Sequence, residues 1–256
     1  MLLTIDIGNT NVTLGVYEGE KLTQHWRMAT NREHMPDEYG IMMANLLAYA
    51  GILPDDLEGI CMASVVPTLT GRFKEACATY FNQEPLNVTT ATLTGVEILL
   101  DDKKSIGADR LVDVVAVKKF YGDPACVVDF GTATTFDAID QDGAYIGGAI
   151  APGIGVSLEA LVNATSQLLR VDLQAPPSVI GKNTTHAMQS GLLFGYVSMV
   201  EGMIARFREV LGPEMKVIAT GGLAELVAQH TKTIQITAPW LTLDGLRLIW
   251  EMNQSL

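Results

Sequence analysis

The chain has 256 residues, which is enough for one large domain or two modest ones with a sizeable buried core. Its 17 Lys and Arg against 29 Asp and Glu give a net charge of −12, with 48% apolar and 18% charged residues. A chain this acidic, without a cluster of basic residues, is repelled by nucleic acid and by anionic membranes, so we expect neither as a partner. The composition is typical of a globular protein and excludes a disordered one.

The cysteines and the first residues of the sequence bear on the compartment. Cys61, Cys77 and Cys126 lie far apart, and the four histidines form no i, i+4 pair, which disfavours structural zinc and a disulfide framework. The opening MLLTIDIGNT lacks the basic region and cleavage site of a signal peptide. No apolar run approaches the ~20 residues that a membrane-spanning helix needs. We therefore expect a soluble, cytoplasmic protein.

The first half of the chain predicts three strands followed by alternating helices and strands. The strands are expected over residues 2–7, 12–17 and 22–28, with turn formers between them. A helix opens at Pro36 and stops at Gly51, and a buried strand follows over 59–65. A second helix is expected to start at Pro67.

The second half repeats this plan. Three strands are expected within residues 125–150, and a further strand, KVIAT, over 216–220. The helical patterns lie at 155–168, 184–211, 222–230 and 241–253. Asp6-Ile7-Gly8 matches Asp129-Phe130-Gly131 about half a chain later, which indicates an internal duplication. We predict an α/β protein of two similar lobes, 1–122 and 123–256, each a mixed sheet with three leading antiparallel strands, and a nucleotide cleft between the lobes.

The first repeated motif, DIGNTN, has the composition of a phosphate-binding turn. Gly8 lets a ligand approach the backbone, and the amides and side chains of Asn9, Thr10 and Asn11 can hold phosphate oxygens. Asp6, beside them, can bind Mg²⁺ directly or through water. An ordinary Gly-Asn hairpin is the alternative for one copy. The second copy, DFGTATT at 129–135, favours a nucleotide-binding role for both.

Two further motifs fit this interpretation. In VIATGGLA (217–224), Gly221 and Gly222 permit a flat ring to pack on the backbone, although a glycine-rich strand-to-helix loop is the alternative. Asp109 and Arg110, which follow Gly107, could supply a general base beside a clamp for an anionic substrate. The alternative is a helix start with an acidic residue in its first turn.

Taken in order, the motifs resemble a known family over nearly the whole chain. They are DIGNTN, GADR, DFGTATT, GGAIAPG (147–153), GKNT (181–184) and TGGLA (220–224), and together they resemble the type III pantothenate kinases. The resemblance implies the actin-like, ribonuclease H-like fold of the acetate and sugar kinase/Hsc70/actin superfamily. It also implies phosphorylation of pantothenate by ATP with Mg²⁺, the first step of coenzyme A synthesis, and a monovalent cation, K⁺ or NH₄⁺.

The resemblance also assigns roles by motif position. The implied ATP-binding residues are Asp6, Ile7, Gly8, Asn9, Thr10, Asn11, Val12, Thr13 and Thr132. The implied pantothenate-binding residues are Gly107, Ala108, Asp109, Arg110 and Thr184. Asp109 would be the proton acceptor, Asp129 would ligate the monovalent cation and Asp6 would hold Mg²⁺, directly or through water. One departure is Leu100, where relatives often carry Tyr.

The long helix expected over 184–211 bears on assembly. Gly191, Gly195 and Gly202 lie close to one of its faces, where small residues would let another helix approach tightly. Burial within its own lobe is the alternative. The resemblance implies a homodimer, in which Thr184 could reach pantothenate in the partner chain.

Two other functions are compatible with parts of this pattern. One is a small-molecule kinase of the same superfamily with a sugar or acetate as acceptor, although Arg110 beside Asp109 favours an anionic substrate. The other is a non-catalytic nucleotide-binding regulator. The acidic charge and the lack of a helix-turn-helix pattern argue against direct DNA contact.

Overall fold

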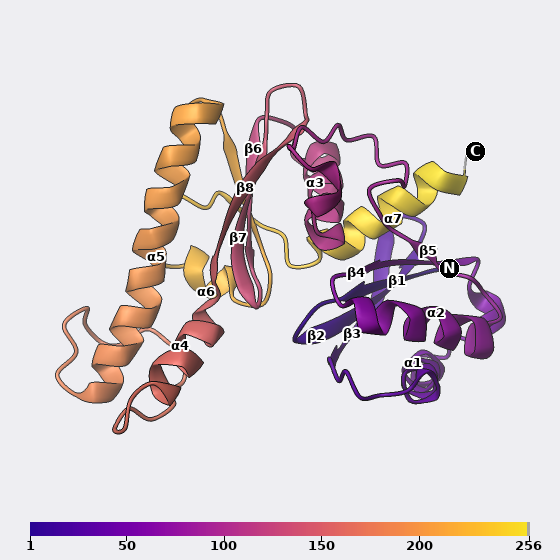
Figure 1. The fold of residues 1–256 in the computed structure, drawn as a ribbon, viewed down its shortest axis with the longest axis horizontal. Coiled ribbons are helices and arrows are strands. Elements are labelled where there is room, and N and C mark those ends of the chain that lie inside the picture. The colour runs from indigo at the N-terminus through magenta and orange to yellow at the C-terminus, as the bar shows by residue number, and fades with distance from the viewer. Residues whose placement is uncertain (255–256) are drawn as a thin grey trace. The chain divides into compact units, whose positions relative to one another are not determined.

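The structure, a computed structural model that describes residues 1–254, divides into two compact units (Figure 1). The first unit comprises Met1–Gly95, Asp101–Ala116 and the C-terminal segment from Leu241, and the second comprises Val96–Leu100 and Val117–Trp240. The division into lobes 1–122 and 123–256 stays a prediction. By its contacts, the segment from Leu241 belongs to the first unit.

Strands of the first unit form a five-stranded mixed sheet in the order β3-β2-β1-β4-β5. They are β1 (Leu2–Ile7), β2 (Asn11–Glu18), β3 (Lys21–Ala29), β4 (Gly59–Ser64) and β5 (Leu86–Asn87). The first three are antiparallel, as predicted, and β4 runs parallel to both β1 and β5. Asp6 therefore lies opposite Thr13 on one side and Ala63 on the other.

Strands of the second unit repeat this arrangement in the order β8-β7-β6-β9-β10. They are β6 (Ala125–Phe130), β7 (Ala133–Ile139), β8 (Tyr145–Pro152), β9 (Lys216–Thr220) and β10 (Ile236–Thr237). Asp129 lies opposite Thr135 on antiparallel β7 and Thr220 on parallel β9, as Asp6 does in its own sheet. The predicted duplication is thus confirmed at the level of strand order, direction and register.

The helices keep most of their predicted bounds. They are α1 (Pro36–Tyr49), α2 (Pro67–Phe81), α3 (Ala108–Phe120), α4 (Ile154–Asn163), α5 (Thr184–Leu211), α6 (Ala224–Ala228) and α7 (Leu241–Gln254). Short 3₁₀ turns form at Pro54–Asp56 and Lys103–Ser105. Helices α4 and α6 are shorter than predicted, whereas α5 has the predicted bounds, because the Asn183 side chain caps its first turn and Gly212 follows its last. Among the helices of residues 1–254, none is both long and apolar enough to cross a bilayer.

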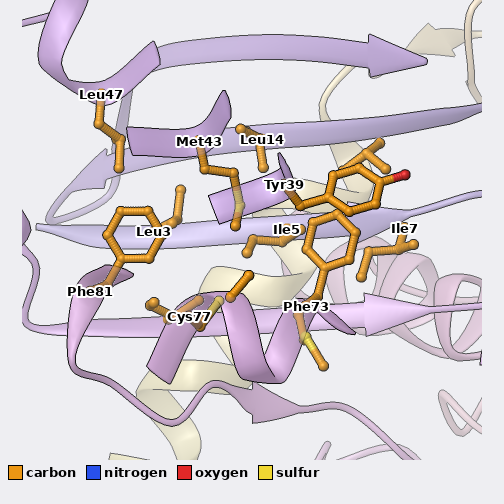
Figure 2. Packing of buried hydrophobic residues seen from close by; sticks show 14 of the residues in the cluster. Leu3, Ile5, Ile7, Leu14, Tyr39, Met43, Leu47, Phe73, Cys77 and Phe81 are labelled. Carbon is orange, nitrogen blue, oxygen red and sulfur yellow. The ribbon is translucent and has the colours of Figure 1, made fainter. Parts of the chain in front are cut away.

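The core of the first unit lies between its sheet and helices α1 and α2 (Figure 2). Alternate residues of β1, namely Leu3, Ile5 and Ile7, point to this side and are fully buried, as the two-residue period of a strand requires. Tyr39 and Phe73 bring their rings together here, with centroids 4.4 Å apart. The second unit has an equivalent core, made by β6, β7 and β9 with helices α4, α5 and α6.

The other face of the first sheet is covered by α7, and glycines on the strands make this close packing possible. A Cβ atom on Gly15 would lie 2.8 Å from Leu243 Cδ1, and one on Gly59 would lie 1.9 Å from Trp250 Cζ2. Two strand positions without side chains therefore receive two bulky side chains of the last helix. This complementarity explains why the end of the chain joins the first unit.

Polar contacts fix α7 to its neighbours. The Thr242 hydroxyl donates to Asp113 Oδ1 of α3 at 2.7 Å, and the Tyr17 hydroxyl donates to Asp244 Oδ1 at 2.7 Å. Burial, and then the bond to Asp244, raises the pKa of Tyr17, so this phenol stays a donor. Helix α3 is thus held against α7 one turn after Asp109.

Candidate active site

The turn between β1 and β2 presents a row of small polar side chains. Asp6 is half-buried at the end of β1, and the side chains of Asn9, Thr10 and Asn11 are exposed. The Gly8 amide donates to the Asn11 carbonyl at 3.0 Å, which closes the turn. A Cβ on Gly8 would lie 3.1 Å from that carbonyl oxygen, so a side chain here would crowd the turn.

A second segment, which directly follows β3, holds this turn in place. The Thr30 amide donates to the Thr10 carbonyl at 2.9 Å, and the Thr30 hydroxyl donates to the Gly8 carbonyl at 2.7 Å. Arg32 Nη2 donates to Asn9 Oδ1 at 2.9 Å. The sequence analysis missed this segment, because no motif marks it and only the pairing of β3 with β2 brings it beside the turn.

The Gly-Ala-Asp-Arg motif begins helix α3 and lies at the same edge of the first sheet. A Cβ on Gly107 would lie 3.6 Å from Val65 Cγ1, and the Val65 amide donates to the Ile7 carbonyl at 3.1 Å. Val65 directly follows β4, so the motif and the Asp6 turn both lie where the parallel strands β1 and β4 end. Ligands of α/β sheets characteristically bind outside the carboxyl ends of their parallel strands.

The Asp109 carboxylate is half-buried and oriented by the backbone. Its Oδ1 accepts the Arg110 amide at 2.7 Å, and a Cβ on Gly107 would lie 2.5 Å from the same oxygen. Glycine at position 107 is therefore needed for the carboxylate to take this position. The arrangement leaves a preoriented carboxylate at the head of a helix, with an arginine as the next residue.

In the second unit, the Asp129 carboxylate lies between two glycine loops. A Cβ on Gly221, whose φ is +89°, would lie 2.3 Å from Asp129 Oδ1, and one on Gly131 would lie 3.3 Å from Oδ2. The TGGLA motif thus packs against the DFG turn, as the parallel pairing of β6 and β9 requires. A carboxylate with both oxygens next to bare backbone suits a hard cation that prefers oxygen ligands.

The exposed Thr132 is positioned by a third loop. Its carbonyl accepts the Gly153 amide at 3.1 Å, and a Cβ on Gly153 would lie 2.3 Å from the same oxygen. This contact ties the GGAIAPG motif to the DFGTATT turn. The conformation of each motif therefore depends on the other, although the two are separated in the sequence.

Thr184 and Leu100 complete the set of singled-out residues, and both belong to the second unit. Thr184 is the exposed first residue of α5, and Asn183 caps that helix by accepting the His186 amide at 2.8 Å. Gly181 is needed for the same turn, because a Cβ there would lie 2.2 Å from the Ala187 amide nitrogen. Leu100 Cδ2 lies 3.6 Å from the position of a Cβ on Gly147, in β8.

The structure thus brings the predicted residues together in two groups. In the first unit, residues 6–13 and 107–110 lie at the same edge of the sheet, where β1 and β4 end. In the second, Asp129 and Thr132 meet Gly131, Gly153 and Gly221 at the ends of β6 and β9.

Two units of identical strand order, each with an aspartate before a glycine turn, define an actin-like fold of the kind found in sugar kinases. A sugar kinase from Listeria monocytogenes, described as an N-acetylmannosamine kinase, matches with a TM-score of 0.53 and 12% identity over 99% of both chains. A Baf family protein from Campylobacter jejuni matches with a TM-score of 0.65 and 19% identity over 99% of this chain and 100% of that one. At these identities, both matches show similarity of fold alone.

The family follows from sequence comparison. The model of the type III pantothenate kinase family matches residues 2–206. A type III pantothenate kinase from Roseiflexus sp. (strain RS-1) is 52% identical over 255 residues, which cover 100% of both chains. The chain belongs to the type III pantothenate kinase family, as the ordered motifs predicted.

The contact between Gly221 and Asp129 gives a stability prediction. Gly221→Ala should lower the free energy of unfolding by about 1–3 kcal/mol, because alanine is strained at positive φ and its Cβ would overlap the carboxylate. Gly222→Ala is the matched control, since a Cβ there meets no atom within 4 Å. Urea unfolding followed by circular dichroism measures both, and equal stability of the two variants would contradict this packing.

Proposed function

We propose that the protein transfers the γ-phosphoryl group of ATP to the primary hydroxyl of pantothenate, giving 4′-phosphopantothenate for coenzyme A synthesis. The observation that carries this proposal is the shared position of Asp109 and the Asp6–Asn11 turn at the ends of β1 and β4. A group that can accept a proton and a turn that can hold phosphate thus lie at the same edge of one sheet, which supports a single site. Membership of the type III pantothenate kinase family supports pantothenate as the acceptor.

The nucleotide and its metal would be held by the polar turns. We assign residues 6–13 to the ATP phosphates and Thr132 to a further nucleotide contact. Asp6 would hold Mg²⁺ directly or through water, because its half-buried carboxylate adjoins the turn. The metal supplies neutralisation of phosphate charge. The exposed side chains of Asn9, Thr10 and Asn11 orient the phosphate oxygens.

The acceptor would be held and activated by residues 107–110. Arg110 pairs with the pantothenate carboxylate, since a guanidinium binds a carboxylate through two parallel hydrogen bonds. Asp109 accepts the hydroxyl proton as the new bond to phosphorus forms, and its bond from the Arg110 amide keeps it oriented. Phosphoryl transfer depends mainly on positioning and charge neutralisation, so no covalent intermediate with the protein is needed.

We also propose that the enzyme works in the cytoplasm. Its three cysteines are free and buried, and burial raises the pKa of the Cys77 thiol to about 12. Free thiols are typical of proteins from a reducing compartment.

The activity is tested with pantothenate, MgATP and K⁺, with phosphopantothenate and ADP as measured products. Asp109→Asn should lower kcat by roughly 10²–10⁴-fold with little change in ATP affinity, because it removes the proton acceptor and keeps its size. Asp101→Asn, which alters an exposed acid upstream, should leave kcat unchanged. A near-normal kcat in Asp109→Asn would show that this residue is structural. Phosphorylation of a sugar or acetate in place of pantothenate would overturn the proposed acceptor.

Activity should depend on K⁺ or NH₄⁺ through Asp129. A carboxylate beside nucleotide phosphates is repelled by them unless a cation lies between, and the Asp129 carboxylate lies against the backbone of Gly131 and Gly221 in the loops assigned to the nucleotide. We expect low activity in sodium buffer and rescue by potassium, with the rescue lost in Asp129→Ala. Asp142→Ala, in the exposed turn after β7, should retain the rescue. Equal rates in Na⁺ and K⁺ would count decisively against a cation at Asp129.

We propose that the active unit is a homodimer formed through α5. The small residues Ala187, Gly191, Gly195 and Ser198 form an exposed stripe along this helix, and a Cβ on Gly191 or Gly195 would meet no atom within 4 Å. This stripe favours the approach of a second helix over burial within the unit. Thr184, at the head of the same helix, could then serve the partner's site.

Light scattering and mixed dimers test this assembly. Full activity at a mass near the 27.6 kDa of one chain would rule out an obligatory dimer. Asp109→Asn chains mixed with Thr184→Ala chains should recover activity, because one of the two sites in each mixed dimer would have both residues intact. Verified mixed dimers without recovery would show that each site uses residues of one chain alone.

A further inference from the structure

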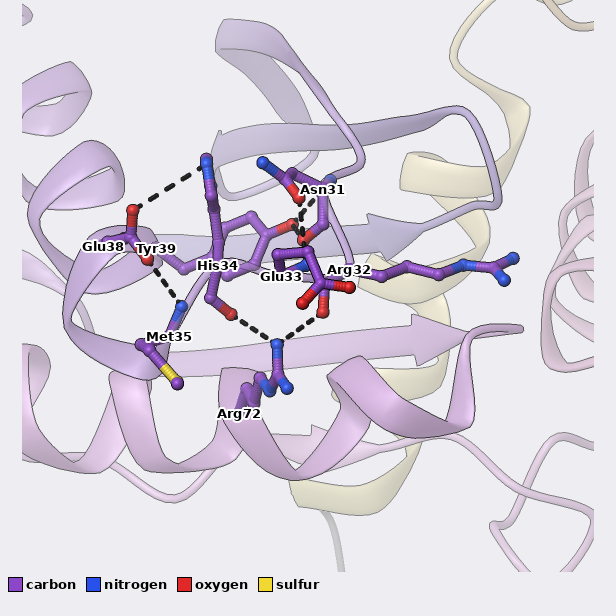
Figure 3. Close-up of polar contacts among 8 residues, drawn as sticks. All are labelled: Asn31, Arg32, Glu33, His34, Met35, Glu38, Tyr39 and Arg72. Carbon is purple, nitrogen blue, oxygen red and sulfur yellow. Dashed lines mark hydrogen bonds and ion pairs between the residues drawn. The ribbon is translucent and has the colours of Figure 1, made fainter.

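The positively charged side chain of Arg32 lies against the turn that we assign to the nucleotide phosphates. Arg32 belongs to none of the motifs found in the sequence. Arg32 Nη2 donates to Asn9 Oδ1 at 2.9 Å, and the rest of this exposed side chain extends away from its own loop (Figure 3). A guanidinium carries several N–H donors in one plane, so a single bond to Asn9 leaves capacity for an anion bound at two points.

Hydrogen bonds from helices α1 and α2 hold the backbone around Arg32. Arg72 Nη1, on α2, donates to the Arg32 carbonyl at 2.6 Å and to the His34 carbonyl at 2.7 Å (Figure 3). The buried Tyr39 accepts the Asn31 amide at 3.0 Å and donates its hydroxyl to the Asn31 carbonyl at 2.8 Å. Two helices of the first unit thus hold this irregular segment in one conformation.

The same segment is fixed from the side of the turn by Thr30, which bonds both Gly8 and Thr10. A single exposed contact between Arg32 and Asn9 contributes little to stability, because both groups would otherwise bind water. The support on both sides fixes the backbone from which the Arg32 side chain extends. It is the arrangement expected of a side chain whose position matters for a ligand, since preorganisation lowers the entropy lost on binding.

We propose that Arg32 binds the polyphosphate of the nucleotide held by the Gly8–Asn11 turn. The inference rests on the proposed function, which assigns phosphates to this turn. In a chain of net charge −12, a polyanion needs local cations, and Arg32 supplies one at the turn. Arg32 keeps its charge throughout and neutralises phosphate charge by two parallel N–H donors, with no proton or bond exchanged.

Calorimetric titration of MgATP, MgADP and adenosine into the full chain tests this role. Arg32→Ala should weaken MgATP and MgADP binding about 10- to 100-fold, and adenosine binding should not change, because the charge-assisted bonds go to phosphate. Arg32→Lys should restore binding in part, since it keeps the charge but loses the planar fork. The pantothenate KM should stay as in the unaltered chain.

Lys21→Ala is the matched control. Lys21 is an exposed cation at the β2–β3 turn, at the other end of the strand from Asn11, and its removal changes the net charge equally. Nucleotide affinity within twofold of normal in Arg32→Ala, or an equal loss in Lys21→Ala, would overturn the proposal. Because binding is the readout, an unaltered chain that binds MgATP but makes no phosphopantothenate would overturn only the pantothenate assignment. An unaltered chain that binds no nucleotide would overturn both.

Discussion

The candidate site depends on one constraint, which is the pairing of the central strand in each sheet. This strand has an antiparallel neighbour on one side and a parallel neighbour on the other. In the first sheet this strand is β1, and in the second it is β6. The antiparallel neighbour must return through a tight turn, and the parallel neighbour must end at the same edge. Asp6 and Asp129 occupy the last position but one of these strands, each opposite a threonine of the returning strand. Strand pairing thus places each aspartate near the end of its strand, two residues before its glycine, before any ligand contributes.

In the first unit, the position of the Gly-Ala-Asp-Arg motif (residues 107–110) depends on distant parts of the chain. Asp109 begins α3, and α3 is held by Thr242 and by the close approach of Gly245 to the Val112 carbonyl, where a Cβ would lie at 2.2 Å. Helix α7 in turn rests on β1, whose other face carries the core of α1 and α2. The position of the candidate base is therefore set by the last helix of the chain.

The sequence predicted the long elements well because their signals are local. The strands before each Asp-x-Gly turn and the bounds of α5 follow from apolar periodicity, from turn residues and from the Asn183 cap. The two-residue strands β5 and β10 carry no periodicity and were missed. The motif residues were identified by type and order, but the packing of Gly221 against Asp129 and the role of Thr30 arise from strand pairing. Such contacts join residues that share no local pattern.

The candidate site contains local positive charges that the acidic composition of the chain does not reveal. An acidic chain disfavours polyanions at long range, so a nucleotide and a carboxylate substrate require cations placed at short range, where an effective dielectric constant below that of water strengthens attraction. The first unit places Arg110 beside Asp109 and Arg32 beside Asn9, both on backbone that hydrogen bonds hold in place. A guanidinium carried by such a backbone attracts an anion at short range. The acidic net charge of the chain and its anionic proposed substrates are compatible because these two arginines would act on the substrates at short range.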